Sequence, residues 1–280
     1  MSRPTLAFAG EPGSFGEDAA LAHLAGADTQ PVPTFRDVFE ALERGQADGG
    51  VVPIENVTHG TVREVYDLLL EFEPAIVGEV EVPVELCLAA LPGQRLDDIE
   101  RVYSHVQALA QAEPFLRSLG CQLLASTTTA GAGAEIARRG ERGSAAVLSP
   151  RAAVVHGLEV LAEGIQSDAR NRTRFLVLAG EASPAWLPPA PSNAAVRTTL
   201  AFGVANEPGT LLRVLSVFAG NGINMSKLES RPSRARDWEY VFWADLDTDL
   251  CAEGSAVILQ QLGQVTVSLR TLGCYPVKGG

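Results

Sequence analysis

The segment EASPAWLPPAPSN, residues 181–193, divides the chain into two regions with different sequence patterns. It contains four prolines and two serines, a composition typical of a stiff, extended linker. A chain of 280 residues is also long enough for two domains. We therefore predict a first domain over residues 1–181, a linker over 182–196 and a second domain over 197–280.

The region before the linker alternates short apolar runs with helical patterns. A capping box at Thr34 and Asp37 predicts a helix over Phe35–Arg44, and an apolar stripe predicts another over Val62–Phe72. The predicted strands are Leu6–Ala9, Gly50–Pro53, Ala75–Val82, Arg101–Ser104, Gln122–Ala125, Ala145–Leu148 and Phe175–Ala179. This alternation is typical of open α/β sheets. Extended crossings near residues 75–90 and 160–178 indicate two lobes hinged about a central cleft.

The region after the linker follows a different order of elements. Leu200, Phe202 and Val204 alternate as in a strand, and Leu211 to Phe218 carries a helical stripe. The predicted order continues with strands over Ile223–Arg231 and Glu239–Asp247, a helix over Ser255–Leu262 and a strand over Val265–Leu272. The order βαββαβ is the ferredoxin-like arrangement.

Composition excludes several classes of function. The net charge of −12 repels nucleic acid and acidic lipid, so neither is an expected partner. No apolar run approaches the length of a membrane span, and the start lacks a signal peptide. The four histidines lack metal-ligand spacing, and Cys87, Cys121, Cys251 and Cys274 lack a CxxC motif. We therefore predict no metal site and a reduced, cytoplasmic chain.

Five polar segments follow predicted strands or begin predicted helices in the first region. They are Gly10–Phe15, Pro53–Gly60, Ser104–Gln111, Thr127–Ala134 and Asn171–Phe175. Ligands of α/β folds bind at such positions. Each segment also has a simpler explanation. Gly10–Phe15 could be a turn and Pro53–Gly60 a capped loop, while His105 and one threonine of Thr127–Thr129 could each cap the next helix. Asn171–Phe175 could be a solvated polar stretch before a strand. Five of them in one domain favour a ligand cleft over separate turns and caps.

In this order, the five segments resemble those of prephenate dehydratase. The later segments Gly209–Leu212, Ile223–Asn224 and Glu229–Pro232 resemble the phenylalanine-binding ACT domain that follows that enzyme. The most specific motifs are Thr-Arg-Phe at residues 173–175 and Glu-Ser-Arg-Pro at residues 229–232. The chain departs from the family at three positions, where Gly16 and Val57 replace serine and Val106 replaces proline.

The resemblance implies a two-lobed domain of the periplasmic-binding-protein-like type II class, followed by the ACT domain. It implies conversion of prephenate to phenylpyruvate, with loss of carbon dioxide and the ring hydroxyl and with no cofactor or metal. Thr173 is the expected catalytic residue and donates a hydrogen bond to the departing oxygen, with Glu55 and His105 as candidate ionisable partners. The expected substrate-binding residues are Ser14, Asn56, Thr128, Arg174 and Phe175.

The same resemblance implies a regulatory site for L-phenylalanine and a homodimer or homotetramer. The expected site residues are Gly209, Thr210, Leu211, Leu212, Asn224, Glu229, Ser230, Arg231 and Pro232. Alternatives stay open at this point. The enzyme could be an arogenate dehydratase, whose substrate has an amino group where prephenate has a ketone. The first domain could be a non-catalytic binding protein for amino acids or small anions, and the second could serve dimerisation only.

Overall fold

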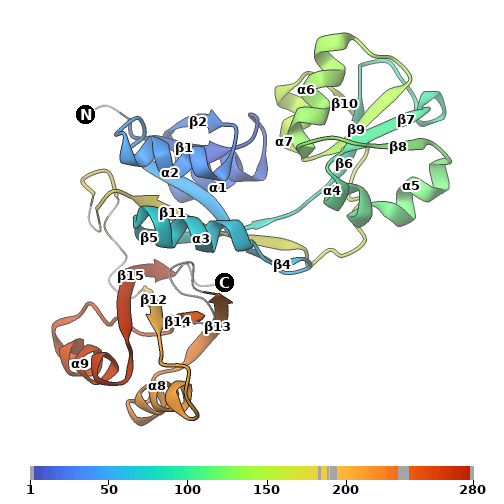
Figure 1. The fold of residues 1–280 in the computed structure, drawn as a ribbon. Helices are drawn as coiled ribbons and strands as arrows, with labels where there is room; N and C mark the ends of the chain where they lie inside the picture. The colour runs from blue at the N-terminus through green and yellow to red at the C-terminus, as the bar shows by residue number, and fades with distance from the viewer. Residues whose placement is uncertain (1–2, 182–183, 188, 190–193, 233–239, 278–280) are drawn as a thin grey trace. The chain divides into compact units, whose positions relative to one another are not determined.

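The computed structural model describes residues 3–181, 184–187, 189, 194–232 and 240–277 (Figure 1). The chain divides into two compact units. One comprises Met1–Phe72 and Val80–Leu176, and the other comprises Glu73–Glu79 and Val177–Gly280. Residues 182–183, 188 and 190–193 of the predicted linker lie outside the described part of the chain.

The first sheet has the strand order β2-β1-β3-β11-β5, with β4 paired to β3. Its strands are β1 (Thr5–Ala9), β2 (Asp28–Val32), β3 (Gly49–Asn56), β4 (Gly60–Thr61), β5 (Ala75–Pro83) and β11 (Arg172–Ala179). The helices of this lobe are α1 (Phe15–His23), α2 (Phe35–Glu43) and α3 (Arg63–Phe72). β1 is parallel to both β2 and β3. Helix α2 begins where predicted, with the capping box of Thr34 and Asp37 formed.

The second sheet has the order β10-β6-β9-β7-β8 and lies in the lobe drawn in green in Figure 1. Its strands are β6 (Cys87–Ala90), β7 (Arg101–Ser104), β8 (Gln122–Ala125), β9 (Ser144–Leu148) and β10 (Glu159–Ala162). Its helices are α4 (Val106–Gln111), α5 (Glu113–Leu119), α6 (Thr129–Arg139), α7 (Pro150–Val155) and the 3-10 turn η1 (Leu96–Asp98).

All five residues of the central strand β9 are buried because both faces of this sheet are covered. Ala145 and Val147 face one core with α4 and α5. Ala146 and Leu148 face a second core with α6 and α7. This burial on both faces explains why the strand has an uninterrupted run of apolar residues.

The C-terminal elements form an antiparallel sheet of order β13-β14-β12-β15. Its elements are β12 (Ala195–Gly203), α8 (Thr210–Gly220), β13 (Met225–Pro232), β14 (Tyr240–Leu246), the 3-10 turn η2 (Glu253–Ser255), α9 (Ala256–Val265) and β15 (Ser268–Val277). The apolar side chains of α8 and α9 join those of β12 and β14 in one core. The predicted βαββαβ order and the α/β fold class are therefore confirmed.

The prediction missed three strands and one division. Strand β2 reads DTQPV, β4 has only two residues and β10 only four, so none of them has the apolar run of a central strand. The extended stretch at residues 75–90 is two strands, β5 and β6, which belong to different sheets. Such a strand pair is what a crossing between two lobes requires.

The prediction of a reduced chain is wrong, because Cys251 and Cys274 form a disulfide. The two cysteines are 23 residues apart, and nothing in that spacing predicts the pair. The fold brings them together, since β15 runs beside β12 and the segment after β14 returns to the same end of the sheet. Of the described helices, none is long and apolar enough to cross a bilayer.

Candidate active site

The amide of Asn56, at the end of β3, holds the Thr173 hydroxyl of β11 in place. Asn56 Nδ2 donates to Thr173 Oγ1 at 2.9 Å and to Asn171 Oδ1 at 2.8 Å. Asn56 Oδ1 accepts from the backbone N–H groups of Thr58 and His59 at 3.0 and 2.9 Å. These backbone donors fix which end of the amide carries the nitrogen. Because Thr173 Oγ1 accepts this bond, its own hydrogen remains available for a ligand.

Two adjoining cavities lie beside this pair, and residues of both lobes line them. The larger, about 460 Å³, contains Thr173 and Asn56 in its wall. The smaller, about 270 Å³, is bounded by the loop before α1 and the start of α6. Residues in the walls of both are Phe15, Phe35, Pro53, His105, Thr129 and Phe175. The predicted residues Thr173, His105, Ser14, Asn56, Thr128 and Phe175 thus lie around one cleft.

Four helix N-caps line the smaller cavity, and they differ in what their side chains do. Thr128 Oγ1 accepts from Gly131 N at 3.0 Å, and Ser149 Oγ from Ala152 N at 3.0 Å. His105 Nδ1 accepts from Gln107 N at 3.3 Å, so this histidine does cap its helix. Ser14 Oγ is buried but makes no hydrogen bond. The N-terminus of α1 therefore presents a free hydroxyl and free backbone N–H groups to the cavity.

Glu55 and Arg174 lie elsewhere. Arg174 NH2 lies 3.5 Å from Glu55 Oε2, and neither residue is part of the wall of the two cavities. The cause is the alternation of side chains along a strand. Thr173 and Phe175 face the cleft, so Arg174 between them faces the other side of the sheet. The structure therefore separates these two predicted site residues from the other six.

Gly13 allows the two lobes to approach each other closely at the smaller cavity. Its φ is +85°, and a Cβ placed there would lie 2.6 Å from Ala152 Cα. Ser149 Oγ donates to Gly13 O at 2.8 Å, while Gly13 N donates to Glu17 Oε2 at 2.7 Å. A side chain at residue 13 would therefore force the two lobes apart at this point.

Burial raises the pKa of the nearby Asp18 carboxyl to about 6, against the attraction of Arg151; the charge of Glu17 raises it further. The folded chain thus binds this proton more tightly than the unfolded chain does. The resulting stability is present at low pH and is lost as the pH rises through about 6.

We expect Asp18→Asn to raise the melting temperature at about pH 7.5 by roughly 2–4 °C. At that pH the Asp18 carboxyl is ionised although its burial disfavours the charge, and asparagine removes this charge. Near pH 5, where Asp18 is already protonated in the folded chain, the two proteins should melt together. The measurement is thermal unfolding against pH, and the exposed Asp97→Asn is the control. An equal gain at both pH values would contradict this account.

His59 and Gln111 also line the larger cavity, although sequence reasoning did not select them. His59 Nδ1 lies 3.1 Å from Asn56 Oδ1 and 3.1 Å from Gln111 Nε2, so the two residues link the lobes beside Thr173. Both lie inside the polar segments already noted, at residues 53–60 and 104–111. The signal was present, but it did not distinguish these side chains from their neighbours.

A separate cavity of about 300 Å³ lies at the N-terminus of α8. Its wall includes Gly209, Thr210, Leu211 and Leu212, together with Tyr240 and Phe242 of β14. Thr210 Oγ1 donates to the carbonyl of Ala205 at 2.7 Å, which shapes the loop before the helix. Asn224 and Glu229–Pro232 are outside this wall. Asn224 Nδ2 donates instead to Asp247 Oδ2 at 2.6 Å.

Comparison with known proteins decides the family. The prephenate dehydratase family model matches residues 6–183, and the ACT domain model matches residues 198–250. The chain belongs to the prephenate dehydratase family. As a family member it is a dehydratase, and its last part is an ACT domain.

Relatives in this family cover nearly the whole chain. An arogenate dehydratase/prephenate dehydratase of Arabidopsis thaliana is 37% identical over 99% of this chain and 73% of its own length. A bifunctional chorismate mutase/prephenate dehydratase of Aquifex aeolicus is 39% identical over 97% of this chain and 73% of its own length. The chorismate mutase activity in its name is a second activity of that relative.

Two solved structures share the fold. Prephenate dehydratase from Arthrobacter aurescens, in complex with L-Phe, is 30% identical with a TM-score of 0.83 and covers 97% of this chain and 90% of that one. A protein described as a novel type of quorum quenching acylase, GqqA, is 33% identical with a TM-score of 0.88 and covers 98% of both chains.

Proposed function

We propose that this dehydratase converts prephenate to phenylpyruvate, carbon dioxide and water in the cleft around Thr173. The hydrogen bond from Asn56 Nδ2 to Thr173 Oγ1 carries this proposal. Because the oxygen of Thr173 accepts this bond, the hydroxyl hydrogen is left to be donated to the substrate. The ring carboxylate leaves as carbon dioxide while its bonding electrons complete the aromatic ring. The hydroxyl on the opposite ring carbon departs, accepts the hydrogen bond of Thr173, and takes up a proton to leave as water.

The substrate carboxylates need a positive environment, and helix N-termini can supply it. Helices α1 and α6 both begin at the smaller cavity, and Ser14 Oγ adds a free donor there. Backbone N–H groups and the helix dipole favour an anion at such a position. Phe15, Phe35 and Phe175 provide an apolar wall for the ring. We assign carboxylate binding to this region, and we assign Arg174 to holding Glu55 behind the sheet.

His105 is our candidate for the proton that the leaving oxygen takes up. It lines both cavities, and its Nδ1 is engaged as the cap of α4. Its Nε2 is therefore the ring nitrogen left for substrate or a bound water. Thr173 is too weak an acid to lose its own proton, so it acts by orientation and hydrogen bonding while His105 exchanges the proton.

The free hydroxyl of Ser14 gives a prediction about substrate binding. We expect Ser14→Ala to raise KM about tenfold through loss of one hydrogen bond to a carboxylate, with an unchanged melting temperature. Ser149→Ala is the matched control: its hydroxyl caps α7, so its loss should lower stability by about 1 kcal/mol. A Ser14→Ala protein with normal KM and lowered melting temperature would show that Ser14 is merely structural. Steady-state kinetics and thermal unfolding measure both effects.

Arogenate dehydration is the near alternative, since the chain is similar to proteins named for both substrates. Arogenate carries an ammonium group where prephenate has a ketone, and its product is phenylalanine. Paired kcat/KM values for the two substrates test the proposal directly. Formation of phenylpyruvate from prephenate with the higher kcat/KM supports it. A higher value for arogenate would reassign the substrate, and no product from either would overturn the activity.

The likeness to GqqA raises amide hydrolysis as a second activity. A serine hydrolase needs its nucleophile hydrogen-bonded to a base. Ser14 is the buried serine of the cavity whose hydroxyl lacks a partner, and Ser149 Oγ is bound to the backbone of Gly13. Neither has a base beside it. The described cleft therefore favours elimination over acyl transfer.

We propose further that the ACT domain binds L-phenylalanine and regulates the dehydratase. The cavity at the N-terminus of α8 suits an amino-acid carboxylate, and Tyr240 and Phe242 suit a ring. Asn224 and Glu229–Pro232 lie outside its wall, and we assign them to a facing copy of the domain in a homodimer or homotetramer. Calorimetry with phenylalanine and sedimentation of the full chain test binding and assembly. The cytoplasm is our proposed location, although several plant relatives are named chloroplastic.

A further inference from the structure

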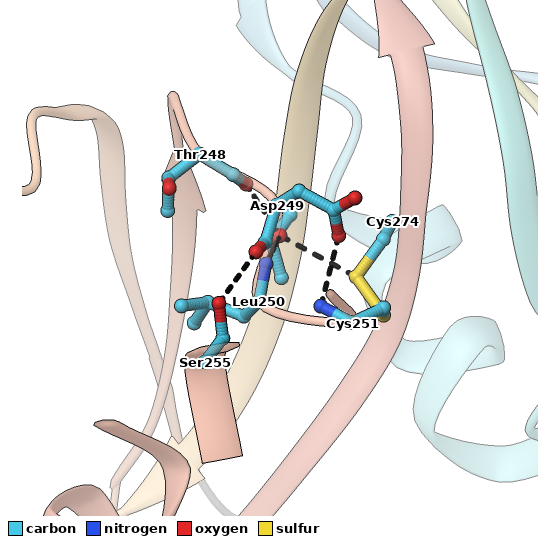
Figure 2. The surroundings of a disulfide bond; sticks show 7 residues. Thr248, Asp249, Leu250, Cys251, Ser255 and Cys274 are labelled. Atoms are coloured by element: carbon cyan, nitrogen blue, oxygen red, sulfur yellow. Dashed lines mark hydrogen bonds between the residues drawn. A yellow bond between two sulfur atoms is a disulfide. The ribbon is translucent and has the colours of Figure 1, made fainter. Parts of the chain in front are cut away.

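The disulfide of Cys251 and Cys274 lies beside a carboxylate that the dehydratase reaction does not use. Cys251 follows β14, Cys274 lies in β15, and Asp249 precedes Cys251 by two residues (Figure 2). Cys251 is exposed, whereas Cys274 and Asp249 are half-buried. Small thiols in solution can therefore reach the bond at Cys251.

The three side chains converge as metal ligands do. One ligand atom from each of Asp249, Cys251 and Cys274 lies within 4.8 Å of the other two. Asp249 Oδ1 accepts from Cys251 N at 2.9 Å, which holds the carboxylate next to the sulfurs, as Figure 2 shows. Thr198 Oγ1 lies 3.4 Å from Cys274 Sγ and donates its hydrogen to the carbonyl of Thr248 at 2.6 Å, so this hydroxyl adds a polar neighbour beside the sulfurs.

We propose that Asp249, Cys251 and Cys274 form a site for a thiophilic divalent cation such as Zn²⁺ when the disulfide is reduced. Two thiolates and one carboxylate fill three corners of a tetrahedron, and the exposure of Cys251 leaves the fourth to water. Zinc–sulfur bonds of about 2.3 Å place two sulfurs about 3.7 Å apart, so the disulfide and the metal exclude each other.

The redox change balances with ordinary cellular thiols. Two molecules of a small thiol reduce the disulfide to two cysteine thiols and form one small disulfide. Metal binding then releases the two thiol protons. The remaining cysteines do not compete: burial raises the pKa of the Cys87 thiol to about 11, and Cys121 belongs to the core of the second lobe.

The test uses the full chain, reduced with a phosphine that is then removed without oxygen, and cadmium as the probe. We expect one Cd²⁺ per chain, seen as sulfur-to-cadmium charge-transfer absorbance and displaced by Zn²⁺. Cys251→Ser and Cys274→Ser should abolish it, and Asp249→Asn should weaken it about tenfold or more. Cys121→Ser is the matched control and should bind normally. Any of three results would overturn the site: no absorbance in the reduced chain, retention in either cysteine variant, or equal binding by the oxidised chain.

A second observation, independent of the cysteines, concerns a chain of polar contacts through the same end of the sheet. Asn224 of the expected phenylalanine site donates to Asp247 Oδ2 at 2.6 Å. Asp247 Oδ1 lies 3.7 Å from Arg197 NH2. Arg197 NH1 contacts both oxygens of Glu79 in β5, at 2.5 and 2.7 Å. Residues 73–79 and 177–280 form one compact unit, so all four residues lie within it.

The pair of Glu79 and Arg197 is well suited to transmit a change. Their side chains are only 6% and 16% exposed, so separating the charges leaves one of them buried and uncompensated. Glu79 belongs to β5, the neighbour of β11, and β11 carries Thr173. We infer that Asn224, Asp247, Arg197 and Glu79 connect phenylalanine binding to the catalytic strand. This inference rests on the proposed sensing of phenylalanine.

The test compares Glu79→Gln with Glu73→Gln, which weakens a pair between the exposed Glu73 and the half-buried Arg270 in the same unit. We expect Glu79→Gln to bind phenylalanine in calorimetry. The change that phenylalanine makes in its kcat/KM should nevertheless be about threefold or more smaller than the change in the parent. Glu73→Gln should respond as the parent does. An unchanged response in Glu79→Gln would overturn the route. A parent chain that binds no phenylalanine would overturn the proposed sensing and the route with it.

Discussion

Thr173→Ala should lower kcat about 10²–10³-fold and leave KM within about threefold of the parent value. The hydroxyl of Thr173 is oriented by Asn56 so that its hydrogen points to a ligand, and the departing oxygen needs that hydrogen most as charge develops on it. The ground-state substrate depends instead on the helix N-termini and the aromatic wall of the cavities. The effect should therefore appear in kcat.

Two further variants separate the hydroxyl from the shape of the side chain. Thr173→Ser keeps the hydroxyl and should retain activity within about tenfold, while Thr173→Val keeps the volume and should resemble alanine. Single-turnover measurements exclude product release as the slow step. If Thr173→Val kept kcat within a few-fold of the parent, leaving-group assistance would have to come from another residue, and His105 would be the first to examine.

Much of the first domain was predictable because its signals are local. Buried parallel strands have apolar runs, helices have caps, and ligand-facing groups follow strand ends, so the five polar segments could be expected at one cleft from these patterns. The family resemblance then selected Thr173, Asn56, His105 and Ser14 within them, and all four line the two cavities. The alternation rule could also have separated Arg174 from Thr173. It was outweighed by the chemical fit between a guanidinium and a carboxylate, which says nothing about which face a side chain occupies.

Other features depend on contacts between distant segments. Gly13 could be predicted as a turn, but its close approach to Ala152 needs the second lobe in place. Ser14 makes no side-chain cap hydrogen bond, whereas Thr128 and Ser149 both do, so Ser14 Oγ stays without a partner. All three are hydroxyl residues at helix N-caps, and the sequence does not distinguish them. Cys251 and Cys274 meet because of sheet register. Sequence spacing contains none of this information.

Gly209→Val should abolish the response to phenylalanine while leaving basal kcat and KM unchanged. Gly209 is the N-cap of α8 and has a φ of +84°. It is part of the wall of the 300 Å³ cavity, so a side chain added at residue 209 would lie at that wall. A β-branched residue there is strained and moves the backbone N–H groups that would bind the carboxylate. We expect the Kd for phenylalanine to rise about a hundredfold, roughly the loss of two charged hydrogen bonds.

Gly222→Val is the matched control for that variant. Gly222 has a φ of +68°, is equally open to solvent and lies just past the other end of α8. A valine at residue 222 therefore adds the same kind of backbone strain, but away from the cavity. Its melting temperature should fall as that of Gly209→Val does, while its phenylalanine affinity should stay near the parent value. Equal loss of affinity in both variants would mean that general destabilisation of the domain, and not the helix N-terminus, explains the effect. Calorimetry and thermal unfolding on the full chain distinguish these outcomes, because the first measures the site and the second measures the strain.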